Sequence, residues 1–320
     1  MGEWIVGTDV LARSRFAVSP LIETVAAFKA LSGHSVHPWR RPWVAAHTPA
    51  YRSLLAADPF ARAFVAAAFR PRWVADFLVT PPESSDATFD GDLVGLRSMS
   101  PREMRAELEA EGDYQLPPVL RGGDLVDRVE ELITWAWRRT VEPEWSRRRR
   151  LFEADIVTRA QRLGSVGWAG TVTGMRPDMR WIGEGRLQVN AYDHPPQNIA
   201  DATLSFIPTT CRRGWIGLDE AHRRYTVVYP CAGTLADPAV AAPSDALARL
   251  LGAGRALILA QLDTPRTTTQ LAALTGYALG SVGGHLRVLL DAQLVHRRRS
   301  GRAVLYYRSP RGDHLVSTEP

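Results

Sequence analysis

Four arginines lie close together near the end of the chain, on either side of a Ser300-Gly301 pair: Arg297, Arg298, Arg299 and Arg302. A Gly-containing turn between two short segments predicts a β-hairpin, with strands at 294–299 and 302–308. Guanidinium groups form charge-assisted, bidentate hydrogen bonds with phosphate oxygens. The hairpin is therefore a candidate phosphate-binding element, and a solvated tip is the alternative.

The residues before the hairpin predict a helix over 278–290 with two unlike faces. Val282, Leu286 and Leu289 recur at helical spacing and predict a buried face. Side chains that are small or able to hydrogen-bond occupy the other face: Gly280, Ser281, Gly284, His285 and Arg287. Small residues would let the helix backbone approach a DNA groove, and the polar ones would face base edges and phosphates. For His285, packing between helices is the alternative role.

Two more helices are predicted ahead of this one. The first spans about 245–262 and is interrupted by Gly252 and Gly254. A run of hydroxyl residues then offers caps for a short helix that ends at Gly276, and these positions complete the candidate DNA contacts: Thr267, Thr268, Thr269 and Gln270. Two helices joined by a tight turn, then a basic hairpin, predict a winged helix-turn-helix in a C-terminal head, 244–320. A head of this kind used only for protein contacts is the alternative.

The head also carries the whole net charge of the protein. Residues 244–320 contain ten arginines and five acidic residues, whereas residues 1–243 contain 29 basic and 29 acidic residues. The formal charge of +5 therefore belongs to the head. Because Lys29 is the only lysine and the arginine bias runs through the chain, the position of the arginines is informative and their number is not. A basic head on a neutral body indicates a nucleic-acid partner.

The stretch 267–308 resembles the ArsR/SmtB type of transcriptional regulator. That family has a V-x-x-H-L-x-x-L helix, then A-x-L-V and a basic R-x-G-R-x-x-x-Y hairpin, which this sequence matches at Val282, His285, Leu286, Leu289, Ala292, Leu294, Val295, Arg299, Gly301, Arg302 and Tyr306. The resemblance implies a DNA-binding regulator that acts as a homodimer on a double-stranded operator. The body, with DVLARSRFAVSPLIETVAAF and PAYRSLLAADP, resembles a domain of unassigned activity that precedes such heads in actinobacterial regulators.

Two departures from the family limit what the resemblance implies. Metal-sensing members carry a Cys-x-Cys pair, but the head contains no cysteine, which excludes thiolate metal sensing there. Members commonly end in a long dimerisation helix, whereas only residues 310–320 follow the hairpin. We therefore expect dimerisation through the first helix of the head or through the body.

The body, 1–230, is expected to have a mixed α+β fold with a small antiparallel sheet, joined to the head by a small-residue, Pro-containing linker at 231–243. Periodicity and caps predict helices at 20–31, 50–57, 59–69, 73–79, 101–111, 124–139 and 144–163. Short apolar segments predict strands at 4–7, 186–189, 203–207, 214–218 and 225–229. The arginine run 147–150 is interpreted as a solvated helix face.

Several groups in the body invite a chemical function. Cys211, His222 and Cys231, with Asp219 and the Asp193-His194 pair nearby, could form a zinc or redox site, but their spacing matches no compact ligand motif. Packed-loop histidines are expected at His34, His37 and His47. The ten tryptophans, all before residue 216, could line a pocket for a small apolar or aromatic effector, with core packing as the alternative.

The chain as a whole has the composition of a folded protein. We expect it to function in the cytoplasm, associated with the nucleoid. Its 45% hydrophobic and 23% charged residues are typical of globular proteins, and no apolar run approaches the length of a membrane span. Common nucleotide-binding and hydrolase motifs are absent, so we expect no enzyme activity, catalytic residue, cofactor or metal. The expected function is sequence-specific transcriptional regulation, with repression ahead of activation and with DNA binding modulated through the N-terminal body. An enzyme or zinc-site body tethered by the head, and a protein-interaction adaptor, are the alternatives.

Overall fold

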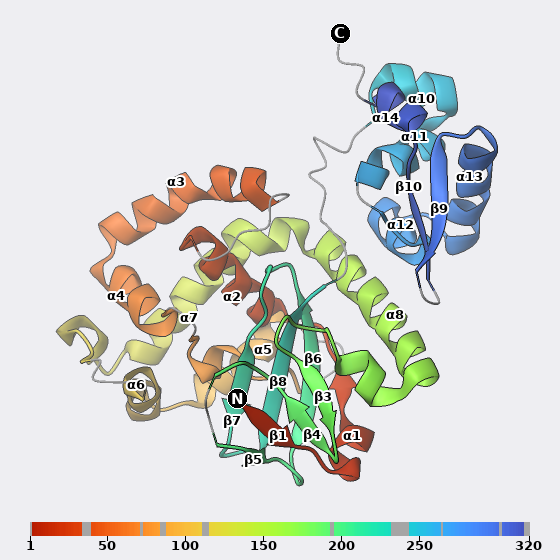
Figure 1. The fold of residues 1–320 in the computed structure, drawn as a ribbon. Coiled ribbons are helices and arrows are strands. Elements are labelled where there is room, and N and C mark those ends of the chain that lie inside the picture. Colours follow the sequence, from red (N-terminus) through yellow and green to blue (C-terminus); the bar gives the residue numbers. More distant parts are fainter. Residues whose placement is uncertain are drawn as a thin grey trace. The chain divides into compact units, whose positions relative to one another are not determined.

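A computed structural model describes residues 2–33, 40–70, 73–83, 88–110, 115–192, 195–231, 243–263, 265–300 and 303–316. The chain divides into two compact units, one of Met1–Ser146 with Arg159–Cys231 and the other of Arg147–Thr158 with Ala232–Pro320. The chain contains many helices together with small sheets, which confirms the predicted α+β class (Figure 1). Most of the expected linker, 232–242, lies outside the described residues.

The described body contains eight α-helices, and one of them, α2 (Pro20–Leu31), is almost entirely buried. Ser19 caps this helix by accepting a hydrogen bond from the backbone N–H of Ile22 at 3.0 Å, and Pro20 occupies its first turn, as the sequence predicted. All of its residues except Lys29 are buried. The other helices are α1 (Thr8–Arg13), α3 (Arg41–Ala57), α4 (Pro59–Ala68), α5 (Phe89–Ser98), α6 (Pro101–Glu109), α7 (Leu125–Ala136) and α8 (Trp145–Val172).

Several helix boundaries differ from the prediction. Helix α3 begins at Arg41 rather than near residue 50, and α1 occupies a stretch too polar to signal a helix. Helix α5 was not among the predicted helices, and Thr88 caps its start by accepting from the N–H of Gly91 at 3.0 Å. Helix α8 continues past residue 163 to Val172, with a non-helical break at Gly167 (φ 67°). In the 147–150 run, Arg148 is buried, so that run is not a uniformly solvated face.

Two four-stranded sheets complete the body. The first has the order β2 (Arg15–Phe16), β6 (Thr203–Thr209), β8 (Arg224–Pro230), β7 (Ile216–Asp219), and the second the order β3 (Arg180–Gly183), β4 (Arg186–Gln188), β1 (Glu3–Ile5), β5 (Gln197–Asn198). Both sheets are mixed rather than purely antiparallel as predicted. Strand β7 pairs with β8, β3 with β4 and β1 with β4 in antiparallel, whereas β2, β6 and β8 are mutually parallel and β1 pairs with β5 in parallel. Strand β8 inserts between β6 and β7 instead of extending a meander.

The central strands β6 and β8 are buried on both faces, which is typical of parallel strands covered on both sides. On one face Ile207 and Val228 join the core formed by the helices. On the other, Phe206 and Tyr229 pack with residues of β1 and β4. The first sheet therefore lies between a helical layer and the second sheet.

In its described residues, the head contains five helices and one hairpin: α10 (Asp245–Leu251), α11 (Ala253–Ala260), α12 (Thr268–Thr275), α13 (Leu279–Asp291), β9 (Val295–Ser300), β10 (Ala303–Arg308) and α14 (Pro310–Val316). Gly252, at φ 83°, divides the first predicted helix into α10 and α11. One buried core joins Leu259 of α11, Leu271 of α12 and Leu286 of α13 with Val295 of β9. Among the helices in the described part of the chain, none is both long and apolar enough to cross a membrane.

Candidate functional site

Helix α12 is fixed at both ends by its own sequence. The Thr267 hydroxyl accepts from the N–H of Gln270 at 3.2 Å, and the Gln270 side chain accepts from the N–H of Thr267 at 2.9 Å, a reciprocal capping box. Gly276, at φ 76°, ends the helix in the left-handed conformation. Thr267 and Gln270 therefore hold the helix start, and Gln270 is buried rather than presented to a partner. Thr268 and Thr269 remain half-exposed.

Helix α13 has the two faces that its sequence predicts. Val282, Leu286 and Leu289 are buried in the head's core. Gly280, Ser281, Gly284 and Arg287 are exposed. A Cβ added at Gly280 or Gly284 would meet no atom within 4 Å, so packing does not require glycine at either position. The exposed face therefore presents bare helix backbone at two positions, beside Arg287 and the exposed apolar side chain of Val288.

His285 lies on neither of these faces. It is half-buried, and its Nε2 would be 2.8 Å from a Cβ placed on Gly254 of α11. The ring of Tyr277 lies 5.9 Å from the His285 ring, centroid to centroid. This placement favours the helix-packing alternative over a base-edge contact, and it shows why Gly254, which looked like an interruption, is small.

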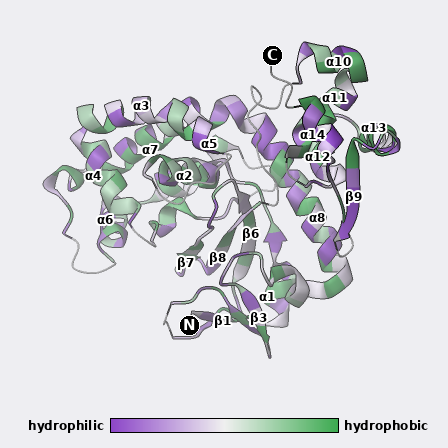
Figure 2. Ribbon diagram, turned by 45° about the horizontal axis from the view of Figure 1, so that its top comes forward, coloured by the Kyte–Doolittle hydropathy of each residue, from purple (hydrophilic) through white to green (hydrophobic). Residues whose placement is uncertain are grey.

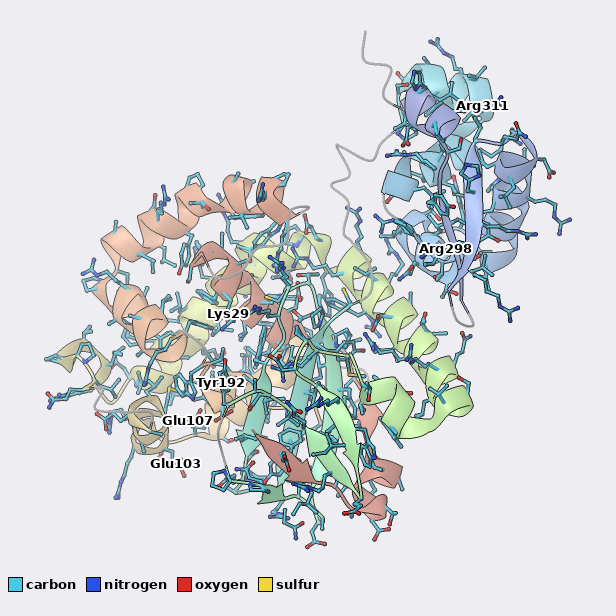
Figure 3. The ribbon with its side chains drawn as sticks, in the orientation of Figure 1. Lys29, Glu103, Glu107, Tyr192, Arg298 and Arg311 are labelled. Carbon is cyan, nitrogen blue, oxygen red and sulfur yellow. The ribbon has the colours of Figure 1, made fainter. Side chains whose placement is uncertain are left out.

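The hairpin distributes its arginines over both of its faces. Strands β9 and β10 pair in antiparallel register, with Arg299, Arg298 and Arg297 opposite Val304, Leu305 and Tyr306. Since side chains alternate along a strand, Arg297 and Arg299 share one face and Arg298 points to the other. All three are exposed, and β9 changes from hydrophobic to hydrophilic along its length (Figures 2 and 3). The single cluster expected at the tip is therefore corrected to a two-sided row, while Arg302 lies outside the described residues.

Backbone contacts anchor the hairpin to the rest of the head. Arg266, which precedes α12, exchanges two backbone hydrogen bonds with Tyr306 of β10, at 2.9 and 2.8 Å. Helix α14 packs closely against the hairpin. A Cβ on Gly312 of α14 would overlap the carbonyl oxygen of Leu294, which precedes β9. The backbone contacts at Arg266 and at Leu294 therefore fix where the arginine row lies relative to α13.

Three further arginines of the head are paired or buried. Arg308 pairs with Asp313 at 2.8 Å, and Arg311 donates to the Gln293 side chain at 2.6 Å. Arg266 is fully buried. Among the described residues, the exposed arginines of α13 and the hairpin are four that the sequence singled out: Arg287, Arg297, Arg298 and Arg299.

The cysteines and histidines of the body form no comparable site in its described residues. Cys211 is buried, and burial raises the pKa of its thiol to about 11. His222 is exposed and contacts Asp219 at 2.9 Å, and the His47 ring lies against Trp43, with centroids 4.7 Å apart. Within the described ranges, no group of three or more His, Cys, Asp or Glu could hold a metal ion. Asp193, His194, His34 and His37 fall outside those ranges.

The tryptophans serve both of the roles that the sequence left open. Trp137 stacks on Phe89, with ring centroids 4.7 Å apart, and Trp168 stacks on Phe206 at 5.3 Å. Trp4, Trp73 and Trp215, by contrast, line a pocket of about 550 Å³ in the body. Packing therefore explains Trp137 and Trp168, and the pocket lined by the other three is a second candidate site.

No family model, curated protein or solved structure matches the chain. Function is therefore inferred from the residues of the two sites themselves.

Proposed function

We propose that the protein is a sequence-specific, double-stranded DNA-binding transcriptional regulator whose head works as a winged helix-turn-helix. The observation that carries this proposal is the exposed glycine- and serine-lined face of α13, followed directly by a hairpin with three exposed arginines. A helix with small side chains fits deep into the major groove, where base edges can be read. The arginines are suited to phosphates or to a narrow minor groove beside it.

Within this proposal the residues have different tasks. Ser281 and the backbone near Gly280 and Gly284 approach base edges. Arg287 reaches a base edge or a phosphate, while Arg297, Arg298 and Arg299 bind the DNA backbone. Thr268 and Thr269, near the start of α12, are suited to a further phosphate contact. By resemblance to its family, the protein acts as a homodimer on an operator with two-fold symmetry, as a repressor.

The test measures binding of the full chain to its own gene's promoter region by fluorescence anisotropy, between about 50 and 200 mM salt. Removing Arg298 and Arg299 together (R298A/R299A) should weaken binding on all DNA sequences. It should also lower the salt slope by about one for each phosphate that is no longer neutralised. Arg287→Ala should weaken binding and, where Arg287 reads a base, relax the preference for promoter over scrambled DNA.

Arg249→Ala is the matched control, because Arg249 is an exposed arginine of the head on α10, outside α13 and the hairpin. Its removal changes the net charge by the same step as Arg287→Ala and should leave the promoter preference unchanged. Equal losses of affinity in the control and in Arg287→Ala, or no binding to promoter DNA by the unaltered protein, would contradict the proposal.

A protein-interaction adaptor is the second candidate, favoured by exposed apolar side chains near the same surface. Leu279 is 54% exposed and Val288 is 45% exposed, both on α13. Apolar side chains gathered on an exposed face are typical of protein contacts. The two candidates are separated by the anisotropy experiment, since an adaptor would show no salt-dependent DNA binding.

A further inference from the structure

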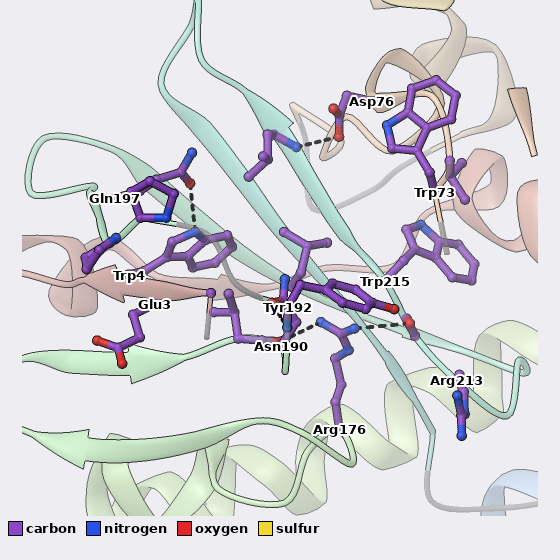
Figure 4. A pocket seen from close by; sticks show the side chains of 18 of the residues that line it. Glu3, Trp4, Trp73, Asp76, Arg176, Asn190, Tyr192, Gln197, Arg213 and Trp215 are labelled. Atoms are coloured by element: carbon purple, nitrogen blue, oxygen red, sulfur yellow. Dashed lines mark hydrogen bonds between the residues drawn. The ribbon is translucent and has the colours of Figure 1, made fainter. Parts of the chain in front are cut away.

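The pocket in the body is built from segments far apart in the sequence. It is lined by residues of β1 and α2, by Arg176, and by residues within 73–76, 189–192, 195–197 and 211–218 (Figure 4). Its volume is about 550 Å³. This size is in the range of small-molecule binding sites. All of these residues belong to the same compact unit.

Aromatic side chains provide flat walls for the pocket. Trp4 is 2% exposed, and its indole N–H donates to the side chain of Gln197 at 3.1 Å. Trp73, Trp215 and Tyr192 contribute further rings. The indole N–H of Trp215 is buried and has no hydrogen-bond acceptor among the described residues. A buried donor left in this state costs free energy unless something accepts its hydrogen bond.

Three cations also line the pocket, and the described part of the chain gives none of them a carboxylate partner within ion-pair distance: Lys29, Arg176 and Arg213. Arg176 is held by two carbonyl oxygens, those of Val189 at 3.2 Å and Gly214 at 3.3 Å, while its Nε is buried and has no acceptor among the described residues. The Lys29 ammonium lies 5.6 Å from the centre of the Trp215 ring. Burial lowers the pKa of Lys29, and it lowers the pKa of Arg176 to about 10.

The two acidic residues that line the pocket are engaged elsewhere. Glu3 forms an ion pair with Arg186, and Asp76 accepts a hydrogen bond from the backbone N–H of Leu218 at 2.9 Å. The segment Gly214–Trp215 connects two half-buried cations, because Arg176 donates to one of its residues and Lys29 lies over the other. A Cβ on Gly214 would overlap the carbonyl oxygen of Val228, so close packing against β8 keeps this segment in place.

From this arrangement we propose that the pocket binds a small organic anion with a flat, apolar body. The anionic group lies by Gly214–Trp215, where Lys29 and Arg176 supply charge and the Trp215 N–H a hydrogen bond. The flat body lies against the rings of Trp4 and Trp73. The binding of this anion does not depend on the proposed function. Its role as the effector that controls DNA binding does rest on the proposed function.

The probes are three aromatic carboxylates, namely benzoate, 1-naphthoate and indole-3-acetate, each compared with its neutral amide by isothermal titration calorimetry on the full chain. At least one carboxylate should bind about tenfold or more tightly than its amide, because a charge-assisted hydrogen bond contributes that much. Lys29→Met and Arg176→Gln should each remove that difference, and Lys29→Arg should keep it. The control Arg52→Gln, an exposed arginine on α3 outside the pocket, should bind as the unaltered protein does.

Lys29 offers a second readout that does not depend on the stability of a variant. Because the chain has one lysine, acylation by an amine-directed reagent can be followed by mass spectrometry at this single side-chain amine. The tightest carboxylate should protect it and the matching amide should not. Equal affinity for carboxylate and amide, no binding by any of the three carboxylates, or no protection of Lys29 would overturn the proposal.

The effector role is tested separately, by repeating the anisotropy measurement with saturating ligand. A change in DNA affinity supports it, and unchanged affinity refutes this role while leaving the binding site intact. A protein that binds the carboxylate but no DNA would refute the proposed function alone.

Discussion

At the scale of single residues, Asp92 on α5 shows how burial changes a charge. Its carboxylate accepts from the Ser19 hydroxyl at 2.7 Å and from the N–H of Leu21 at 3.1 Å, next to the start of α2. Burial raises its pKa to about 6 despite these hydrogen bonds. The folded protein therefore holds this proton more tightly than the unfolded chain does. Above about pH 6 the ionised Asp92 therefore lowers the free energy of unfolding, and this loss disappears as the pH falls toward the ordinary pKa of Asp.

Asp92→Asn should accordingly become more favourable as the pH rises. Relative to the unaltered protein, its free energy of unfolding should increase by about 1–3 kcal/mol between about pH 4.5 and 7.5, as measured by urea unfolding. Asp90→Asn, on the same helix, is the control. Hydrogen bonding to Arg97 lowers the pKa of Asp90 below the ordinary value for Asp, so Asp90 is ionised in both the folded and the unfolded chain throughout this interval, and the stability of this variant relative to the unaltered protein should stay nearly constant. Parallel pH profiles for the two variants would contradict the assignment.

At the scale of elements, α13 predicts a conflict between stability and function. Glycine inside a helix costs about 0.5–1 kcal/mol relative to alanine, and Gly284 has open space around it. Gly284→Ala should therefore raise the free energy of unfolding by about that amount while weakening binding to promoter DNA, since the methyl group would stand between helix and groove. Urea unfolding and anisotropy measure the two effects.

Gly95→Ala is the matched control for this prediction. Gly95 is an exposed glycine inside α5 that also has open space around it. The change should stabilise the protein by a similar amount without altering DNA affinity. If both variants leave DNA affinity unchanged, the exposed face of α13 does not approach DNA closely.

Individual elements also differ in how far the sequence predicts them. Local signals predicted the features that local interactions decide: the Ser19 cap and Pro20 of α2, the start of α6 after its Ser100 cap, and the short helix that Thr267 begins. Strand direction was missed, because β6 and β8 are parallel through a connection that no short-range pattern reveals. For the site, periodicity identified both faces of α13, but the contact of His285 with Gly254 depends on how two helices meet.

The pocket shows the same limit more strongly. Its walls come from Trp4, Lys29, Arg176 and Trp215, which no sequence spacing connects. One signal was present, because the only lysine of an arginine-rich chain falls on a helix that is otherwise buried. That signal indicates a site only once the residues that surround Lys29 in the pocket are known.

At the scale of the whole molecule, the neutral body and basic head predict how the protein assembles on DNA. Light scattering of the purified protein should give a mass of twice 35.4 kDa, since an operator with two-fold symmetry calls for two heads. The complex with DNA should contain two chains per operator. A monomer both free and on DNA would contradict the homodimer and leave single-head binding to be measured by the promoter experiment.

The N-terminal strands have a further consequence, for the kinetics of folding. Glu3 of β1 pairs with Gln188 and Arg15 of β2 pairs with Ser205, so each of these strands joins its sheet only after the chain has grown to a distant partner. Contacts between residues so far apart slow folding, because the long intervening loop must first be closed. Strands β1 and β2 are thus made long before they can reach their final positions, and the body completes its core only when β8 has been made.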